Sequence, residues 1–565
     1  MTLDDAAASL DSISVAEAVG RTLALLGAGH TFGVVGSGNF EVTNALRAAG
    51  VPFTATRHEA GAATAADAYA RLSGKVGLVS VHQGCGLTNA MTGIGEAAKS
   101  RTPIIVLAAE TAGASVTSNF AIDQPALAAS VGARSERVHS AASAVHDTVR
   151  AFRTARGGRR TVVLHLPLDV QRERVPASVL EHITMPPMTV AVRPGAAAVA
   201  ALADQLVSAQ RPVIVAGRGA RGAGPALRTL AEKSGALLAT SAVANGLFVG
   251  DPFALGISGG FSSPLTAELI SDADLIVGFG CALNMWTMRH GRLIAHSAQV
   301  VQVDDDELAL GAHRPIDLGI VGDCAETALA TSEELARRGH TASGYRTPEI
   351  RDRIAHSARW NDTPTADVSS ADQIDPRVLS ARLDELLPAE RVLAIDSGNF
   401  MGYPSAYVRV PDEAGFVFTQ AFQAIGLGLA TALGAATAQP HRLPVLGTGD
   451  GGFLMGIAEL ETIVRMRIPL VVVVYNDAAY GAEVHHFAPE GESSSVDIST
   501  VVFPDTDIAA IGRGFGAEGV TVRRVEDLEA VRRWLESDPR IPLVIDAKIA
   551  SDGGSWWLQE AFAGH

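Results

Sequence analysis

The sequence has few cysteines, no excess of basic residues and no long apolar run, and each absence excludes a class of protein. Its 565 residues include three cysteines, too few and too widely spaced for a disulfide framework or a zinc site. A formal net charge of −16 argues against a general nucleic-acid binder. No apolar run approaches the ~20 residues that span a bilayer, and the acidic N-terminus shows no signal peptide. We therefore expect a cytoplasmic protein that binds neither nucleic acid nor a membrane.

What the sequence does contain is an alternation of short β-branched runs and alanine-rich segments. VGLVSV, PIIVLAA and TVVLHLPL are bounded by turn residues, and helix-like stretches such as EAGAATAADAYARL lie between them. This alternation is typical of α/β domains with parallel sheets. Segments 172–195 and 358–376, rich in proline or in polar residues, divide the chain. We predict three doubly wound parallel-sheet domains and a C-terminal tail that is a candidate lid, over residues 1–180, 190–345, 372–550 and 551–565.

Two glycine-rich turns, 217–222 and 447–452, match the pattern G-x-G-x-x-G of dinucleotide-binding loops. Such a turn is as typical of an ordinary strand-to-helix connection as of a dinucleotide site. The first turn carries Arg218 and Arg221, which suit an anion, whereas the second carries Asp450. Because a carboxylate repels a diphosphate unless a cation lies between them, Asp450 indicates a hard cation such as Mg²⁺.

A second oxygen ligand for this cation stands at the end of the next apolar run. Asn476 and Asp477 follow PLVVVVY directly, which places them at the carboxyl edge of the adjacent strand. Sheets of the α/β class bind their ligands at that edge. A metal-bridged diphosphate therefore accounts for both Asp450 and Asp477. The alternative is an NAD site, which leaves Asp450 without a role.

The GDG turn, the helix and strand after it, and the pair Asn476-Asp477 resemble the fingerprint of thiamin diphosphate-dependent enzymes. The resemblance covers nearly the whole chain, in the order pyrimidine-binding domain, central domain, diphosphate-binding domain. It implies that thiamin diphosphate and Mg²⁺ are the cofactors, with Asp450, Asp477 and the backbone carbonyl of Ala479 as metal ligands. The family pattern has asparagine where this chain has Asp477, and a carboxylate oxygen can replace the amide oxygen there.

The resemblance also assigns a catalytic glutamate and a set of cofactor-binding residues. Glu59 corresponds to the family glutamate that hydrogen bonds the aminopyrimidine ring and promotes loss of the thiazolium C2 proton; by itself it would indicate only an acid at a helix start. Ile425 corresponds to the bulky residue that holds the cofactor in a bent shape. The other assigned cofactor-binding residues are Ser397, Gly398, Asn399, Phe400, Gly449, Asp450, Gly451, Gly452, Asp477, Tyr480 and Gly481.

On the substrate side, VHQGCGLTNAMTGIGEA resembles a first-domain loop of acetolactate synthases, so His82 and Gln83 are expected to face the reacting carbon. Gln124 stands where related lyases and synthases carry an active-site glutamine. In the central domain, Arg218 takes the place of a lysine that meets the ADP part of CoA in oxalyl-CoA decarboxylases, and Asp304 is placed for a ribose hydroxyl. The alternative for Arg218 and Asp304 is a structural nucleotide site.

These assignments predict an enzyme of the acetolactate synthase, oxalyl-CoA decarboxylase and 2-hydroxyacyl-CoA lyase branch. The leading prediction is cleavage of a 2-hydroxyacyl-CoA to an aldehyde or ketone plus formyl-CoA, with Glu492, His485 or Glu483 as candidate base for the substrate hydroxyl. The alternatives are an acetolactate synthase-like carboligase or 2-oxo acid decarboxylase, and a noncatalytic nucleotide-binding subunit. The resemblance implies a homodimer or homotetramer, because in the family the cofactor lies between subunits.

Overall fold

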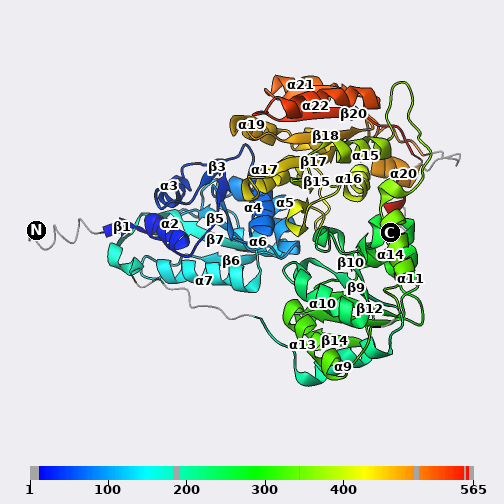
Figure 1. Cartoon of the computed structure of the whole chain (residues 1–565). Helices are drawn as coiled ribbons and strands as arrows, with labels where there is room; N and C mark the ends of the chain where they lie inside the picture. The colour runs from blue at the N-terminus through cyan, green and yellow to red at the C-terminus, as the bar shows by residue number, and fades with distance from the viewer. Residues whose placement is uncertain are drawn as a thin grey trace, which may run out of the picture.

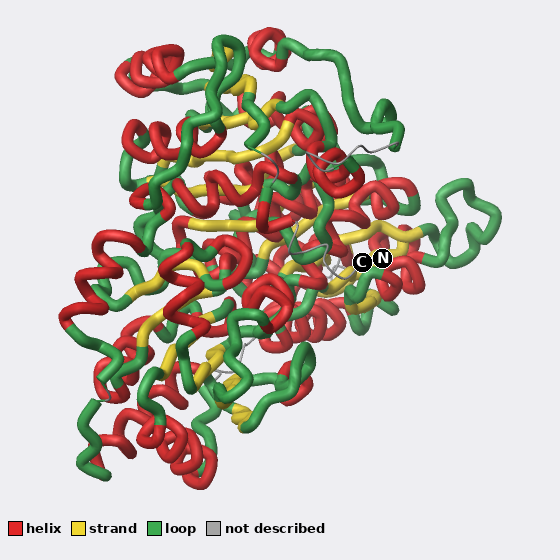
Figure 2. Tube along the Cα trace, turned by 90° about the vertical axis from the view of Figure 1, so that its right-hand side faces the viewer, coloured by secondary structure: helices red, strands yellow, loops and turns green. Residues whose placement is uncertain are grey.

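The structure is a computed structural model that describes residues 12–181, 183, 191–342, 344–488, 496–552 and 555–558. This part of the chain forms three consecutive α/β domains, each built on a six-stranded parallel sheet (Figure 1). The predicted fold class is therefore confirmed. In Figure 2 the strands run between layers of helices, as expected for parallel sheets whose strands are buried on both faces. Within the described residues, no helix is long and apolar enough to cross a membrane.

The N-terminal domain has the strand order β3-β2-β4-β5-β7-β6. A short antiparallel pair, β1 (Ser12–Ser14) with β8 (Arg174–Pro176), closes its ends. The strands are β2 (Thr31–Gly33), β3 (Phe53–Ala55), β4 (Gly77–Val81), β5 (Ile104–Glu110), β6 (Arg134–Arg137) and β7 (Val162–Pro167). The helices are α2 (Val15–Leu25), α3 (Phe40–Ala48), α4 (Glu59–Ser73), α5 (Cys85–Lys99), α6 (Gln124–Ser130), α7 (Ala144–Gly158) and α8 (Leu168–Arg172).

The central domain has a different strand order, β11-β10-β9-β12-β13-β14. This is the order of dinucleotide-binding sheets, and its direction reverses between β9 and β12. The strands are β9 (Pro212–Ala216), β10 (Leu237–Thr240), β11 (Ala254–Ile257), β12 (Leu275–Phe279), β13 (Gln299–Asp304) and β14 (Leu318–Val321). The helices are α9 (Ala196–Ser208), α10 (Gly224–Ser234), α11 (Pro264–Ser271), α12 (Met285–Met288), α13 (Cys324–Arg337) and α14 (Pro348–Ser357).

The C-terminal domain, with strand order β16-β15-β17-β18-β20-β19, repeats the topology of the N-terminal domain. Its strands are β15 (Arg391–Ile395), β16 (Phe416–Phe418), β17 (Leu443–Gly449), β18 (Val471–Asn476), β19 (Glu518–Val522) and β20 (Leu543–Lys548). Its helices are α15 (Pro376–Leu386), α16 (Gly402–Tyr407), α17 (Gly428–Ala438), α18 (Asp450–Met455), α19 (Ala458–Arg465), α20 (Gly481–Phe487), α21 (Ile508–Gly514) and α22 (Glu529–Glu536).

The N-terminal and C-terminal domains share one apolar core. Helix α17 packs against α4, next to α5 (Figure 1). Gly434 of α17 permits a close approach, since a Cβ there would clash with the carbonyl oxygen of Ala65. The same cluster of buried side chains includes Phe32 and Val79 of the first sheet and Leu446 of the last. Two other clusters lie wholly within the central domain.

Candidate functional site

The carboxyl edge of the C-terminal sheet brings together loops that are far apart in sequence. The sheet reverses direction between β15 and β17, and open α/β sheets bind ligands at such a switch point. Asp450 follows β17 directly as the first residue of α18, and Asp477 follows β18. Ser397 and Asn399 lie in the loop after β15. The structure thus places these four predicted cofactor residues at one edge.

Asp450 and Asp477 form a pair of carboxyl groups that repel each other when both are ionised. Asp450 is 7 % exposed, and its burial raises its pKa to about 6. Burial, reinforced by the charge of Asp450, raises the pKa of Asp477 to about 7, and the two side chains share a hydrogen bond. A divalent cation between them would relieve this repulsion, so the pair fits a Mg²⁺ site.

Two glycines of this edge are needed because other groups come close to them. A Cβ at Gly451 would lie 2.6 Å from Cε1 of Tyr480. A Cβ at Gly481 would clash with Oδ2 of Asp477 and lie 3.3 Å from Nδ2 of Asn399. The amide of Asn399 and the carboxyl group of Asp477 therefore converge on the same point of the backbone.

Asn476 shapes the turn that carries the third predicted metal ligand. Its Nδ2 donates to Oδ1 of Asp546 at 2.8 Å, and its Oδ1 accepts the backbone N–H of Ala478 at 3.0 Å. Ala478 has a φ of 56°, a left-handed conformation that non-glycine residues adopt rarely. This turn leads directly to Ala479, whose carbonyl is the predicted ligand. Asn476 thus orders the loop, and Asp477 supplies the charge.

Asp396 joins the loops of the site, although the sequence did not point to it. Its Oδ1 accepts the backbone N–H groups of Ser397 and Leu427, and its Oδ2 accepts the N–H of Gly426 and the hydroxyl of Thr448, at 2.9 to 3.2 Å. Burial raises its pKa to about 6. These bonds connect the loop after β15, the segment next to the half-buried Ile425, and the end of β17. A sequence signal was available but was not used: Asp396 is the acidic residue at the start of DSGNF, residues 396–400.

Glu59 lies in the N-terminal domain as the first residue of α4, and it is half-buried. Nδ2 of Asn89 donates to its Oε2 at 3.1 Å. The two preceding residues, Arg57 and His58, donate their backbone N–H groups to the carboxylate of Glu459 in the C-terminal domain. The start of α4 is therefore held by α19, the helix that follows the one begun by Asp450.

His82 lies at the carboxyl end of β4 and faces the loop after β2. Its Nδ1 is 3.1 Å from the carbonyl oxygen of Gln83, and its Nε2 is 3.4 Å from Oγ of Ser37. The ring of Phe120 packs edge-on against it, with 5.0 Å between ring centroids. Ser37 was missed in the sequence; the G-S-G turn after an apolar run, at the same sheet edge as His82, was the available signal.

Gln83 and Gln124 are buried inside the N-terminal domain. Gln83 points toward Gly38, where a Cβ would clash with its Oε1, and this oxygen has no hydrogen-bond partner among the described residues. Gln124 is 1 % exposed. Its Nε2 donates to the carbonyl of Ala109, and its Oε1 accepts the N–H of Gly84 at 2.8 Å. Gln124 therefore holds the turn next to His82 and does not present a free polar group.

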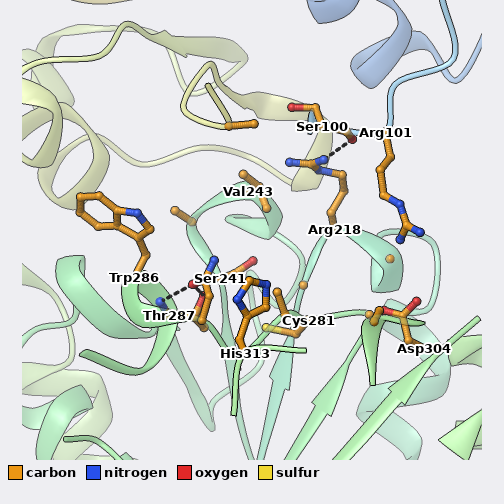
Figure 3. A pocket seen from close by; sticks show the side chains of 18 of the residues that line it. Ser100, Arg101, Arg218, Ser241, Val243, Cys281, Trp286, Thr287, Asp304 and His313 are labelled. Carbon is orange, nitrogen blue, oxygen red and sulfur yellow. Dashed lines mark hydrogen bonds between the residues drawn. The ribbon is translucent and has the colours of Figure 1, made fainter. Parts of the chain in front are cut away.

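A cavity of about 970 Å³ lies at the switch point of the central sheet, between all three domains (Figure 3). Arg218 lines it, but its Nη1 donates to the backbone carbonyl of Ser100 in the N-terminal domain. Burial lowers the pKa of Arg218 to about 10, so the guanidinium stays charged. Asp304 also lines the cavity, and burial raises its pKa to about 6. Among the predicted bases, Glu492 lies outside the described residues.

Comparison with known proteins gives matches over all three domains. The N-terminal TPP binding domain, the central domain and the C-terminal TPP binding domain of thiamine pyrophosphate enzymes match residues 13–127, 199–331 and 396–547. A probable 2-ketoarginine decarboxylase, AruI, of Pseudomonas aeruginosa is 30 % identical over 550 residues, which are 93 % of this chain and 92 % of that protein. The chain belongs to the thiamine pyrophosphate enzyme family.

Other relatives in this family carry different names. A sulfoacetaldehyde acetyltransferase of Castellaniella defragrans is 28 % identical over 557 residues, covering 92 % of this chain and 90 % of that protein. The acetolactate synthase large subunit of Parasynechococcus marenigrum is 28 % identical over 565 residues, covering 95 % and 88 %. The predicted superfamily is confirmed.

The two TPP-binding domains of this thiamine pyrophosphate enzyme contain the residues described above. Glu59, His82 and Gln124 lie in the N-terminal match, and Asp450 and Asp477 in the C-terminal one. The repelling carboxyl pair and the glycines that let other groups approach them fit a diphosphate held through a cation. The family match and the local geometry therefore agree on where thiamin diphosphate would bind.

Proposed function

We propose that the chain is a thiamin diphosphate- and Mg²⁺-dependent enzyme that cleaves the C–C bond next to the carbonyl of a small 2-oxo acid, as a decarboxylase or carboligase. The observation that carries this choice over a CoA substrate is the position of Arg218, which is used in a contact between domains. Among the named relatives, the 2-ketoarginine decarboxylase and the acetolactate synthase support a decarboxylase or carboligase.

The residues of the C-terminal edge would hold the cofactor. Asp450, Asp477 and the carbonyl of Ala479 would bind Mg²⁺, and the Nδ2 group of Asn399 would donate to the diphosphate. When bound, thiamin diphosphate supplies the carbanion stabilisation that C–C bond cleavage needs. The protein binds it, orients it and moves protons. Glu59 would hold the pyrimidine ring through its carboxyl group, which Asn89 keeps in place.

His82 and Ser37 are the proposed acid–base pair for the substrate. The carbonyl of Gln83 can only accept a hydrogen bond, so Nδ1 of His82 carries the proton. In the neutral ring, Nε2 therefore carries the lone pair, which accepts a hydrogen bond from the hydroxyl of Ser37. This pair could move a proton to or from the carbonyl oxygen of the substrate, which develops negative charge when that carbonyl is attacked.

The test is an assay with Mg²⁺, thiamin diphosphate and a panel of 2-oxo acids that differ in side-chain length and charge. Release of carbon dioxide without CoA supports the proposal, and a second aldehyde or 2-oxo acid in the mixture reveals carboligation. His82→Ala, with the exposed neighbour Cys85→Ser as matched control, ties the activity to this site. No carbon dioxide from any member of the panel would argue against the proposal.

A 2-hydroxyacyl-CoA lyase is the second candidate. It is favoured by the size of the central cavity and by its place at the switch point of a sheet with the dinucleotide-binding strand order. The ribose of CoA would lie near Asp304, and its phosphates near the basic residues that line the cavity. Incubation with a 2-hydroxyacyl-CoA separates the two candidates, because only a lyase releases formyl-CoA and an aldehyde or ketone.

We also propose that the active form is a homodimer or homotetramer. The backbone at the start of α4 bonds Glu459 of α19, and we infer that a second copy would supply the diphosphate site that pairs with Glu59. Light scattering of the cofactor-loaded protein tests this proposal, and a purely monomeric active species would contradict it.

A further inference from the structure

The C-terminal segment Ser555–Leu558 is buried against the loop that follows β15. Ser555 is 1 % exposed and Trp557 is 2 % exposed. The indole Nε1 of Trp557 donates to the backbone carbonyl of Asn399 at 3.0 Å, and the hydroxyl of Ser555 donates to Oδ1 of the same asparagine. Trp557 and Ser555 thus hold the backbone and the side chain of Asn399, respectively.

The hydroxyl of Ser555 holds one end of the Asn399 amide, and in the structure the other end faces the cofactor site. An asparagine amide has one accepting end, Oδ1, and one donating end, Nδ2. Because Ser555 occupies Oδ1, Nδ2 points the other way, to within 3.3 Å of the Cβ position at Gly481, beside Oδ2 of Asp477. A donor at this point suits the oxygens of a diphosphate, whereas the opposite amide orientation would present an oxygen and repel them.

The segment is anchored from two domains. The ring of Trp557 packs against Gly402, where a Cβ would lie 2.5 Å from two ring carbons, and edge-on against Tyr403 at 4.9 Å. It also contacts Phe261 of the central domain, at 6.1 Å between ring centroids. This packing fixes the indole N–H in its direction toward Asn399.

Its neighbour Trp556 makes different contacts. Its ring stacks on Trp360 at 5.2 Å, and the guanidinium of Arg289 lies 5.1 Å from it. Neither contact reaches Asn399. Trp556 also packs edge-on against Trp557 at 5.3 Å between ring centroids. A Trp556→Phe variant keeps an aromatic ring there, so Trp556 provides a matched control for Trp557.

We propose that Ser555 and Trp557 are positioning residues for the diphosphate of the cofactor, acting through Asn399. The inference rests on the proposed function, and it gives the C-terminal segment a part in cofactor binding as a fixed clamp, where the sequence suggested a lid over a substrate. The segment touches the loop after β15, and the described contacts of Ser555 and Trp557 leave the Nδ2 group of Asn399 facing the site.

The test measures the Kd of thiamin diphosphate for the apoenzyme at saturating Mg²⁺ by calorimetry. Removing the hydroxyl in Ser555→Ala is expected to weaken binding about tenfold, as is removing the indole N–H in Trp557→Phe, which keeps an aromatic ring in place. Trp556→Phe is expected to bind like the wild type. At saturating cofactor, kcat of Ser555→Ala is expected to stay within about twofold of the wild-type value, and the Tm of the apoprotein should not change.

A double-mutant cycle separates positioning from general stabilisation. In an Asn399→Ala background, Ser555→Ala is expected to cause no further loss of affinity, because its effect passes through Asn399. Unchanged affinity in both single variants overturns the inference, and so does full additivity in the cycle. In either case, binding of thiamin diphosphate by the wild-type protein leaves the proposed function standing. If the wild-type protein binds no thiamin diphosphate, the proposed function fails and the inference falls with it.

Discussion

The carboxylate of Glu459 accepts the backbone N–H of His58 at 3.0 Å, across the boundary between the C-terminal and N-terminal domains. It also accepts the N–H of Arg57 at 3.1 Å and the hydroxyl of Thr462 at 2.7 Å. Gly61 makes this possible, because a Cβ there would clash with Oε1 of Glu459. One buried carboxylate on α19 thus holds the chain just before Glu59. Helix α19 directly follows α18, the helix that begins at Asp450.

Glu459→Ala is expected to lower kcat, because the freed N–H groups of Arg57 and His58 would let the start of α4 move. Losing these part-buried hydrogen bonds to a carboxylate costs about 1–3 kcal/mol of stability. Glu459→Gln keeps an accepting oxygen and should retain most of the activity. Glu461→Ala is the matched control: this more exposed neighbour pairs with Arg57 at 2.5 Å, and its loss should change stability by under ~1 kcal/mol. Equal kcat in Glu459→Ala and wild type would contradict this role.

The apoprotein should lose stability as the pH rises through the range in which Asp450 and Asp477 ionise. Their pKa values are raised from 3.8 to about 6 and about 7, so the stabilising protonated state is fully present below 3.8 and is lost as the pH passes about 6 to 7. Under the proposed function Mg²⁺ would bind the ionised pair, and its binding should reverse this trend. Thermal unfolding with and without Mg²⁺, from about pH 5 to about pH 8, measures both. A Mg²⁺-induced gain in Tm that does not grow with pH would contradict the assignment.

Asp450→Ala is expected to abolish Mg²⁺-dependent retention of thiamin diphosphate, because one charged ligand disappears and Asp477 alone holds a hard cation weakly. Asp477→Asn is the informative companion, since an amide oxygen still coordinates and the repulsion between the two carboxylates is gone. We expect it to keep the cofactor and to show a weaker pH dependence of apoprotein stability. Gel filtration followed by release and quantification of bound cofactor gives the answer.

His82→Ala is expected to reduce kcat by about 10²–10⁴, the range typical of a lost acid–base group. Ser37→Ala should cause a smaller loss, because the imidazole remains. Gln124→Ala should instead lower the Tm, since its amide bonds the turn at Gly84 and the carbonyl of Ala109. A Gln124→Ala variant with normal stability and a collapsed kcat would show that the glutamine acts on the substrate directly.

Arg218→Ala is expected to destabilise the protein and to leave the KM for a 2-oxo acid unchanged. Its guanidinium bonds the carbonyl of Ser100, so truncation leaves a buried acceptor without its partner. Arg160→Ala, another arginine of the cavity wall, is the control for a general loss of positive charge. A rise in KM for an acyl-CoA in Arg218→Ala, with unchanged Tm, would favour the lyase.

The sequence predicted those features that strand patterns and short motifs determine. Parallel sheets follow from buried apolar runs, and Asp450 and Asp477 both stand at strand ends, so their meeting could be expected. Asp396, Ser37 and Glu459 could not be recognised in the same way. Each acts by reaching backbone or side-chain groups that lie in another loop or another domain, and no local pattern encodes such a partner. Arg218 shows the reverse case. Its motif suggested a bound nucleotide as the partner, whereas in the folded chain its partner is the backbone carbonyl of Ser100.

The common core of the first and last domains has a consequence for how the molecule comes apart. Phe32 and Leu446 belong to one apolar cluster that spans both domains, so unfolding of either domain would expose apolar surface of the other. The central domain has clusters of its own. Although the chain reads as three domains, its melting should show the first and last domains unfolding together as one cooperative unit.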